Sequence, residues 1–330
     1  MNTSDSPPPE MLSRLHSHAF SGVISVIDPG REKLLVASGL SNREREIPNL
    51  PSTRFPCASV GKIFTALCVA RLVEDGFCRF DQPVIEILPS LKSHFDSDVS
   101  LAALLSHTSG LGDYIDDDAP LPFSRFDVSQ LDCPTAFLPH VLRAPRGVAG
   151  EFHYSSAGFI LLGFAIEVLT GAAFPDAIAR FVIEPAGLQS TGYPRMNSED
   201  EDIAIGYLDD GSPNLGHIPI RGGPDGGIVT NVGDLEQLFA SLRGCLLGES
   251  SRKFLWARQN RLSPMSDYGH GFYITTIRNR PWYGHTGSDP GISARVAFSV
   301  DSDSSVIVLC NRERVAFEAF RMVVEWLGPG

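Results

Sequence analysis

The pattern of apolar and polar positions opens with two β-rich runs and a strongly apolar helix. The runs at 22–28 and 33–39 flank Pro29-Gly30, a dipeptide that favours a turn, so the spacing predicts a β-hairpin. After a polar loop, residues 57–76 carry apolar side chains on nearly every side of a helical wheel. This distribution is typical of a helix buried on all faces, and Gly76 is suited to end it.

The middle of the chain, from residue 80 to about 200, has the pattern of helices joined by long loops. Helices are expected at 101–107 and 155–171, and the second is again apolar on all faces. From about residue 203 β-like runs return, and an amphipathic helix is expected from about Glu313 to Leu327. The β-like runs lie at 269–279, 294–301 and 304–311. The first 18 residues are polar and Pro-rich, and we expect a loose arm there.

These elements predict a mixed α/β (α+β) protein in which an antiparallel sheet is flanked by helices. Both ends of the chain supply strands, so the simplest arrangement has a discontinuous α/β domain of residues 1–79 and 200–330. A mostly helical domain, residues 80–199, is then inserted between its two parts.

Composition and charge narrow the class of protein. The chain has 330 residues, 43% of them hydrophobic and 20% charged, which supplies enough apolar material for a core. Its net charge of −12 argues against nucleic acid or an anionic membrane as a partner, because phosphate groups are bound by basic patches. No secretory signal and no long apolar run is visible, so we expect a cytoplasmic location. The six cysteines form no CxxC pair and are expected to be reduced and mostly buried.

One lysine stands in an unusual place. The chain has only four lysines, and Lys62 lies inside the most apolar helix, three residues after Ser59, so both side chains share one face. Ser59 falls in the first turn, where free N–H groups and the helix dipole favour a developing oxyanion. Lowering the pKa of a buried lysine from about 10.4 to about 7 requires roughly 4–5 kcal/mol of desolvation and charge repulsion. A neutral Lys62 can then deprotonate Ser59, which is a weak nucleophile on its own.

The spacing Ser-x-x-Lys also has a simpler explanation. A serine can cap a helix while a nearby lysine extends its amine to solvent. The same spacing occurs at Ser250 and Lys253, in a polar stretch where we expect a solvated helix start. The pattern at Ser59 is therefore informative only together with other features of the chain.

Two further segments carry groups suited to acyl chemistry. Tyr154-Ser155-Ser156 directly precedes the second apolar helix, and a tyrosine hydroxyl there can share a proton with a lysine and a serine. The alternative is that one of the two serines caps the helix and the tyrosine packs. Residues 284–288 (Gly-His-Thr-Gly-Ser) follow a β-like run. Their glycines permit close approach of a substrate to a strand edge, where a backbone N–H can complete an oxyanion hole, although a simple turn has the same composition.

Together these segments resemble the serine β-lactamase and penicillin-binding protein superfamily, whose pattern is S-x-x-K, S-D-N and K-T-G. In the family's order, the elements here are Ser59-Val60-Gly61-Lys62, Tyr154-Ser155-Ser156 and His285-Thr286-Gly287. The middle element is similar to the Tyr-x-Asn variant of class C β-lactamases and related esterases. The resemblance covers roughly residues 20–325 and includes the stretches 104–111, 184–193, 222–235 and 268–272.

The resemblance implies a β-lactamase/transpeptidase-like fold and covalent catalysis without a metal or an organic cofactor. Ser59 would attack a carbonyl carbon, while Lys62 and Tyr154 would transfer the proton of the Ser59 hydroxyl. The backbone N–H groups of Ser59 and Ser288 would hold the oxyanion, and water would release the acyl group. The residues expected to bind substrate or oxyanion are Ser156, His285, Gly287 and Ser288.

Two departures from the family pattern bear on the substrate. Ser156 stands where these enzymes usually carry Asn, so an amide that contacts the substrate is missing. His285 stands where most members carry Lys, although some D,D-peptidases and D-aminopeptidases of the superfamily also carry His. A neutral imidazole attracts a substrate carboxylate less than an ammonium does. Both changes favour an ester or a small amide over a β-lactam.

The leading hypothesis is a cytoplasmic serine hydrolase that acts on a small-molecule carboxylic ester or amide. An acyltransferase would use the same acyl-enzyme and pass the acyl group to a bound alcohol or amine, and a weak β-lactamase or D-amino-acid peptidase is a further alternative. A different class is a scaffold that kept the fold and lost turnover. His107 is expected to be a structural turn histidine, and the acidic run at 116–118 to be a solvated loop.

Overall fold

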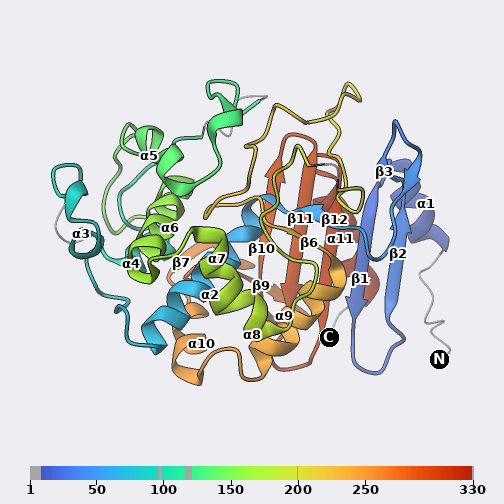
Figure 1. Ribbon diagram of the computed structural model, residues 1–330. Coiled ribbons are helices and arrows are strands. Elements are labelled where there is room, and N and C mark those ends of the chain that lie inside the picture. The colour runs from blue at the N-terminus through green and yellow to red at the C-terminus, as the bar shows by residue number, and fades with distance from the viewer. Residues whose placement is uncertain (1–8, 96–98, 116–120, 199, 329–330) are drawn as a thin grey trace.

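A computed structural model describes residues 9–95, 99–115, 121–198 and 200–328, and its centre is an antiparallel sheet built from both ends of the chain (Figure 1). Within these residues the sheet has eight strands in the order β2-β1-β12-β11-β10-β9-β8-β7. The strands are β1 Gly22–Ile27, β2 Leu34–Ser38, β7 Asn260–Ser263, β8 Ser266–Tyr268, β9 Tyr273–Ile277, β10 Arg280–Asp289, β11 Ile292–Phe298 and β12 Ser305–Cys310. The predicted mixed α/β class and the hairpin β1–β2 are confirmed.

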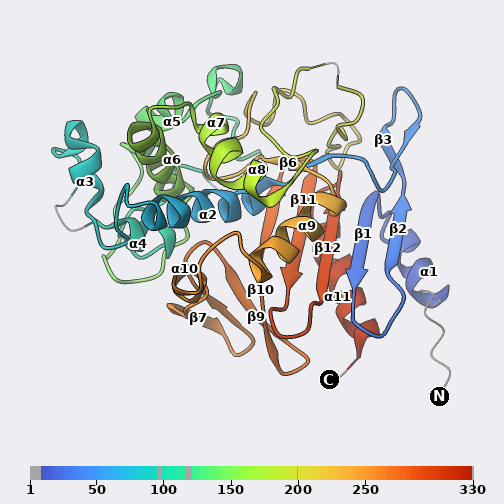
Figure 2. The same cartoon turned by 60° about the horizontal axis from the view of Figure 1, so that its bottom comes forward.

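The two faces of the sheet bury separate clusters of apolar side chains. Because side chains alternate along a strand, Val306 and Val308 of β12 join one cluster, while Ile307 and Leu309 join the other. The first face is covered by α1 (Pro9–Ser17) and α11 (Val315–Leu327), and the second by α2 (Gly61–Glu74) and α9 (Val232–Arg243). Figure 2 shows α9 and α11 on opposite faces of the sheet.

Helix α2 lies at the middle of the molecule, between the sheet and the helices that follow it in the chain (Figures 1 and 2). It contacts β10 on one side and α6 (Ser156–Thr170) on the other, which explains why both helices are apolar on all faces. Gly171, with a φ of 66°, ends α6 in the left-handed conformation that glycine adopts readily. Both helices were predicted from their apolar pattern and are confirmed.

The remaining elements are short. Those between α2 and the end of the helical segment are α3 Val84–Ile87, α4 Leu101–Leu105, α5 Pro134–Val141, α7 Phe174–Ile178 and α8 Glu184–Ala186, with 3₁₀ turns Pro89–Leu91 and Val128–Gln130 and a π turn Ala179–Ile183. Elsewhere lie the 3₁₀ turn Ala58–Val60, helix α10 Glu249–Leu255, and the strand pairs β3 Leu40–Asn42 with β4 Ile47–Pro48 and β5 Phe55–Pro56 with β6 Val229–Thr230. The division into two domains at 80 and 199 stays a prediction.

The structure corrects one local expectation and excludes one local alternative. Residues 9–17 form helix α1 rather than a loose arm, because Met11 and Leu15, one helical turn apart, bury their side chains in the cluster beneath α11. The segment 284–288 follows the β-like run that contains β9, as expected, but the alternative of a simple turn is wrong, because the segment lies inside the long strand β10 and pairs with β11 along its whole length. The acidic run at 116–118 lies outside the described residues.

No single helix in the described ranges is long and apolar enough to cross a membrane. The bent pair Ser156–Thr170 with Phe174–Ala186 jointly reaches that length and composition, with an angle of 78° between its halves. The cytoplasmic location stays a prediction.

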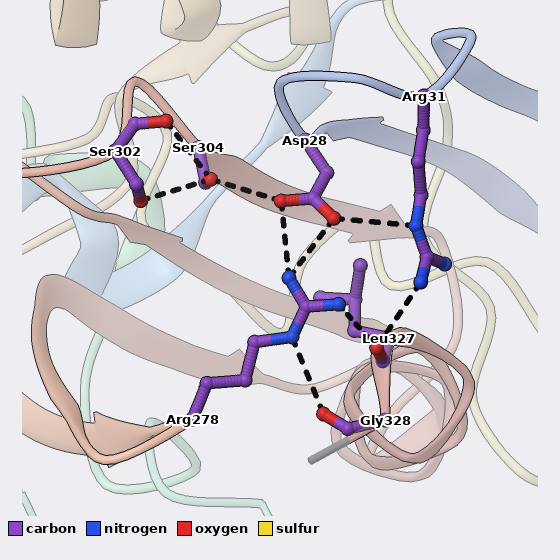
Figure 3. A network of polar contacts seen from close by, with 7 residues as sticks. All are labelled: Asp28, Arg31, Arg278, Ser302, Ser304, Leu327 and Gly328. Carbon is purple, nitrogen blue, oxygen red and sulfur yellow. Dashed lines mark hydrogen bonds and ion pairs between the residues drawn. The ribbon is translucent and has the colours of Figure 1, made fainter. Parts of the chain in front are cut away.

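A half-buried polar network ties the end of the last helix to two hairpins (Figure 3). Arg278, just after β9, places Nη1 3.1 and 2.9 Å from the two carboxylate oxygens of Asp28, at the end of β1. The same guanidinium donates to the carbonyl oxygens of Leu327 and, at 3.2 Å, of Gly328. Arg31 adds a second cation, with Nε 3.5 Å from the Asp28 carboxylate. One arginine thus satisfies carbonyl groups that the end of α11 leaves without helical partners.

Replacing Arg278 by alanine is expected to lower the free energy of unfolding by about 2–3 kcal/mol, because it removes a charge-assisted pair that is largely shielded from solvent. Chemical denaturation measures this change. The matched control is Arg321→Ala, since the Arg321 guanidinium pairs with glutamates on the exposed surface of α11 and should contribute little. Equal losses in the two variants would contradict the assignment.

Candidate active site

Ser59 lies in the 3₁₀ turn before α2, where strand β10 comes very close to the backbone. The preceding residue, Ala58, has a φ of 44°, in the left-handed region that residues other than glycine seldom adopt. A Cβ on Gly287 of β10 would lie 2.2 Å from the Cys57 carbonyl oxygen and 3.1 Å from the Ser59 nitrogen. Only glycine therefore fits at 287, and its absence of a side chain brings β10 beside the Ser59 backbone N–H.

Lys62 is completely buried directly beneath Ser59. Its Nζ lies 3.0 Å from Ser59 Oγ, 3.2 Å from Ser156 Oγ and 2.6 Å from the backbone carbonyl oxygen of Asp225. The alternative of a lysine that extends to solvent is wrong, because the side chain has 0% exposure. The amine is thus held by three oxygen atoms at a position from which it can take the Ser59 proton.

Tyr154 stands on the other side of the serine. Its hydroxyl is hydrogen-bonded to Ser59, and its ring packs 4.9 Å from Lys62 Nζ. Burial raises the pKa of Tyr154 well above its ordinary value, with smaller contributions from Tyr268 and Tyr273, while the bond to Ser59 acts in the opposite direction. The phenol is therefore neutral near pH 7 and carries a proton that it can donate.

Two serines at the start of α6 make different contacts. Ser155 Oγ accepts from the Gly158 N–H at 3.1 Å and so caps the helix, while the Ser156 N–H donates to the Asp113 carboxylate at 2.7 Å. The hydroxyl of Ser156 remains directed at Lys62 Nζ. Of the two capping alternatives left open by the sequence, Ser155 is the cap, and Ser156 belongs to the polar cluster around the lysine.

His285 is a buried residue of strand β10. Its ring is 1% exposed and hydrogen-bonds with the Tyr268 hydroxyl at 3.1 Å and the Thr286 carbonyl oxygen at 2.6 Å. Burial, and then the nearby charge of Lys62, lowers the pKa of His285 to about 3. A neutral, enclosed imidazole therefore occupies this position.

A polar groove opens in front of these groups. It brings together five residues close to the three sequence motifs, namely Ser59, Tyr154, Ser156, Thr286 and Ser288. His285 is not among the residues that line it within the described ranges. The second Ser-x-x-Lys pair lies elsewhere, on α10, where Lys253 is 75% exposed and pairs with Glu249 at 2.5 Å. The structure thus assembles one of the two pairs with the other motifs.

The chain is similar to known proteins along almost its whole length. A family model described as Beta-lactamase matches residues 12–323, almost the whole chain.

The chain belongs to the Beta-lactamase family.

Three similar proteins illustrate the range of this family. The chain is 26% identical to penicillin-binding protein 4* of Bacillus subtilis over 90% of its own length and 69% of that protein. It is 33% identical to esterase EstB of Burkholderia gladioli over 56% of its own length and 48% of that protein. The crystal structure of a penicillin-binding protein from Bacillus halodurans superposes with a TM-score of 0.87, at 30% identity, and covers 96% of this chain and 99% of that one. Membership of this family makes the chain a serine hydrolase.

A second, more apolar pocket adjoins Ser59 in this Beta-lactamase family member. Its apolar walls include Ile115, Phe123, Phe137, Met196, Ile218 and Ile292. Its polar lining includes two carboxylates, Asp225 and Asp289, beside the hydroxyl groups of Ser59, Tyr114 and Ser156. Burial raises the pKa of Asp225, although the charge of Lys62 and a 2.9 Å hydrogen bond from Tyr114 act against that shift.

Several residues of this site were missed by sequence reasoning. Asp225 lies in the stretch 222–235, which looked familial but carried no assigned role, and Asp113 and Tyr114 stand in a loop without a spacing signal. The described residues contain no group of three or more His, Cys, Asp or Glu side chains suited to hold a metal ion. The four buried cysteines are Cys57, Cys68, Cys78 and Cys310, as expected for mostly buried thiols.

Proposed function

We propose that the chain forms an acyl-enzyme at Ser59 and hydrolyses a carboxylic ester or a small amide. The observation that carries this proposal is the 3.0 Å contact between Ser59 Oγ and the fully buried Lys62 Nζ, with the Tyr154 hydroxyl hydrogen-bonded to the same serine. A hydroxyl between an amine and a phenol has both a base to accept its proton and an acid to return one.

In the first half-reaction, Lys62 acts as the neutral amine, and its Nζ takes the Ser59 proton as Oγ bonds to the substrate carbonyl carbon. The carbonyl electron pair moves onto oxygen, and the N–H groups of Ser59 and Ser288 stabilise the resulting oxyanion. The close approach of Gly287 to the Ser59 nitrogen supports this role for β10. When the carbonyl re-forms, the bond to the leaving alcohol or amine breaks. The leaving group receives a proton from the neutral Tyr154 phenol, which recovers one from Lys62.

In the second half-reaction, water replaces the leaving group and the same groups act in reverse. A water molecule in the groove gives a proton to the Lys62–Tyr154 pair as its oxygen bonds to the acyl carbon. The bond between Ser59 Oγ and that carbon then breaks, the serine regains its proton and the carboxylic acid leaves. No group outside the described cluster is needed to balance the protons.

The linings of the site favour an uncharged acyl group. The pocket beside Ser59 combines apolar walls with the carboxylates of Asp225 and Asp289, and the neutral His285 supplies no cation. A substrate carboxylate in this pocket would be repelled, because like charges in a partly buried site interact strongly. These features support an ester or small amide with an apolar acyl chain over an anionic β-lactam.

Replacing Asp225 by asparagine is expected to raise the ratio of kcat/KM for nitrocefin, an anionic β-lactam, to that for p-nitrophenyl butyrate by roughly tenfold, because one negative charge is removed from the pocket. Parallel assays of both substrates give the ratio. Asp267→Asn is the control, since the Asp267 carboxylate pairs with Arg258 at 2.6 Å on β8 and does not line the pocket. An unchanged ratio in the Asp225 variant would refute the charge argument.

The proposed function is tested by incubating the full chain with p-nitrophenyl butyrate and identifying both products. Release of butyric acid supports the proposal. Transfer of the butyryl group to an added alcohol in preference to water would make the chain an acyltransferase instead. Absence of turnover and of any covalent adduct over a wider panel of esters and β-lactams would contradict the proposal and favour a scaffold.

A further inference from the structure

A continuous line of hydrogen bonds runs behind the catalytic cluster. The Ser155 N–H donates to His107 Nδ1 at 3.1 Å, and His107 Nε2 lies 3.1 Å from the Tyr268 hydroxyl. That hydroxyl lies 3.1 Å from His285 Nε2, and His285 Nδ1 lies 2.6 Å from the Thr286 carbonyl oxygen. We call the three side chains His107, Tyr268 and His285 the imidazole bridge.

The partners at the two ends fix where every proton of the bridge lies. The Ser155 N–H can only donate, so His107 Nδ1 is an acceptor and the proton of the neutral ring is on Nε2, directed at Tyr268. The Thr286 carbonyl can only accept, so the proton of His285 is on Nδ1 and its Nε2 accepts from the Tyr268 hydroxyl. Each donor meets one acceptor when both imidazoles are neutral.

The burial of the bridge agrees with this assignment. Tyr268 has 0% exposure, and His107 and His285 have 1% each. Burial and the charge of Lys62 lower the pKa of both histidines, His107 well below its ordinary value and His285 to about 3. The rings are therefore neutral over the whole range in which an esterase is assayed, and the direction of the hydrogen bonds does not change.

Both ends of the bridge attach to catalytic parts. Ser155 follows Tyr154 in the chain, and the His107 ring packs on Tyr154 with ring centroids 4.4 Å apart. At the other end, Thr286 stands two residues before Ser288, whose N–H is proposed for the oxyanion hole. The bridge thus connects the backbone at the start of α6 with the backbone of β10, across the rear of the site.

We propose that the imidazole bridge is a positioning device, in which Tyr268 links two neutral histidines to set the separation between the Tyr154 phenol and the oxyanion strand β10. The inference rests on the proposed function, because it assigns a task in that reaction to residues that do not touch the substrate.

This role also gives a physical reason for histidine at position 285. A neutral imidazole accepts a proton at one nitrogen and donates one from the other, as the contacts to Tyr268 and Thr286 require. A lysine ammonium donates only, so with lysine the Tyr268 hydroxyl would have to turn its proton elsewhere and the direction of the bridge would be lost. The donor and acceptor atoms of His285 therefore complement those of His107 and Tyr268.

The kinetic test is Tyr268→Phe, which removes one oxygen atom, keeps the ring and breaks both central hydrogen bonds. We expect kcat for p-nitrophenyl butyrate to fall by roughly 10–100-fold with KM changed less than about threefold, because the loss affects the alignment of reacting groups more than binding. The matched control is Tyr283→Phe, whose ring stacks on Trp256 and lies outside the bridge. A variant of Tyr268 with normal kcat and only lower thermal stability would show that the bridge is merely core packing.

A spectroscopic test needs no substrate. Nitrogen-15 NMR of the histidine rings in the full chain at pH 6–7 should find His107 protonated on Nε2 and His285 on Nδ1. In Tyr268→Phe the His285 signal should lose the shift of a hydrogen-bonded Nε2. Detection of His285 protonated on Nε2, or on both nitrogens, would overturn the assignment.

Failure of the proposed function can be told apart from failure of the bridge. The rate at which a fluorophosphonate labels Ser59 reports the reactivity of the serine without any ester turnover. If the wild type labels but hydrolyses no ester, the proposed function fails, and the bridge is still tested by a 10–100-fold slower labelling of Tyr268→Phe. Equal labelling rates for wild type and variant would overturn the bridge alone.

Discussion

Replacing Lys62 by methionine lowers kcat/KM for p-nitrophenyl butyrate by roughly 10³–10⁴-fold if the amine is the base that activates Ser59. Methionine has a similar length but cannot accept a proton. The Lys62 Nζ is surrounded by Ser59 Oγ, Ser156 Oγ and the Asp225 carbonyl oxygen. In the variant the serine keeps its place at the start of α2 but faces no amine, so its hydroxyl is as weak a nucleophile as that of a free serine.

Thermal unfolding of the same variant separates catalysis from folding. A buried amine costs desolvation energy, so an apolar replacement of similar volume should leave the melting temperature unchanged or raise it. Lys253→Met is the matched control, because that lysine belongs to the exposed Ser-x-x-Lys pair on α10 and should retain the wild-type rate. A Lys62 variant that keeps more than about a tenth of the wild-type activity would exclude the lysine as the base.

Replacing Tyr154 by phenylalanine is expected to reduce kcat by roughly 10²–10³-fold. The raised pKa of Tyr154 keeps its phenol protonated, so the hydroxyl can deliver a proton to the leaving group. The loss should depend on the leaving group. p-Nitrophenolate departs without a proton, whereas the ethoxide of ethyl butyrate needs one, so we expect the variant to lose more activity on the ethyl ester.

The measurement is a pair of kcat values, one for each ester, in wild type and variant. Tyr283→Phe serves again as the control and should not change the ratio of the two rates. An equal loss on both esters would mean that Tyr154 positions Ser59 without acting as the proton donor.

Elements that depend on local pattern could be predicted from the sequence. The helices α2 and α6 are apolar on all faces because each is enclosed by neighbours, and that property is visible in the residues themselves. The pair Ser59 and Lys62 was also recognisable from local sequence, because a spacing of three residues places both side chains on one face of a helix.

Features that depend on contacts between distant segments could not be predicted. Strand β10 has the composition of a turn around Gly284 and Gly287, and only its pairing with β9 and β11 makes it a strand. His107 and Tyr268 are 161 residues apart in the sequence, so neither carries a local sign of its partner. Asp225 reaches the site because the loop that carries it passes beneath Lys62. No spacing of residues in the sequence predicts this contact.

The burial of His285 illustrates a further limit. The sequence showed that histidine replaces the usual lysine, and the lower attraction for a carboxylate followed from its chemistry alone. The direction of the His285 side chain could not be predicted, because the alternation of side chains along a strand does not show which face of the strand packs inward. The structure encloses the ring between Tyr268 and the Thr286 carbonyl, and we therefore propose that His285 acts on the site through the backbone of β10.

The most direct test of the central claim is to identify the atom that carries the acyl group. Wild type, Ser59→Ala and Ser250→Ala are each mixed with p-nitrophenyl butyrate, quenched in acid within the first turnover and measured by intact mass, followed by peptide mapping. We predict one butyryl group on wild type and on Ser250→Ala, located on the peptide that contains Ser59, and none on Ser59→Ala. A butyryl adduct of equal yield on Ser59→Ala, or turnover of that variant at the wild-type rate, would contradict the account.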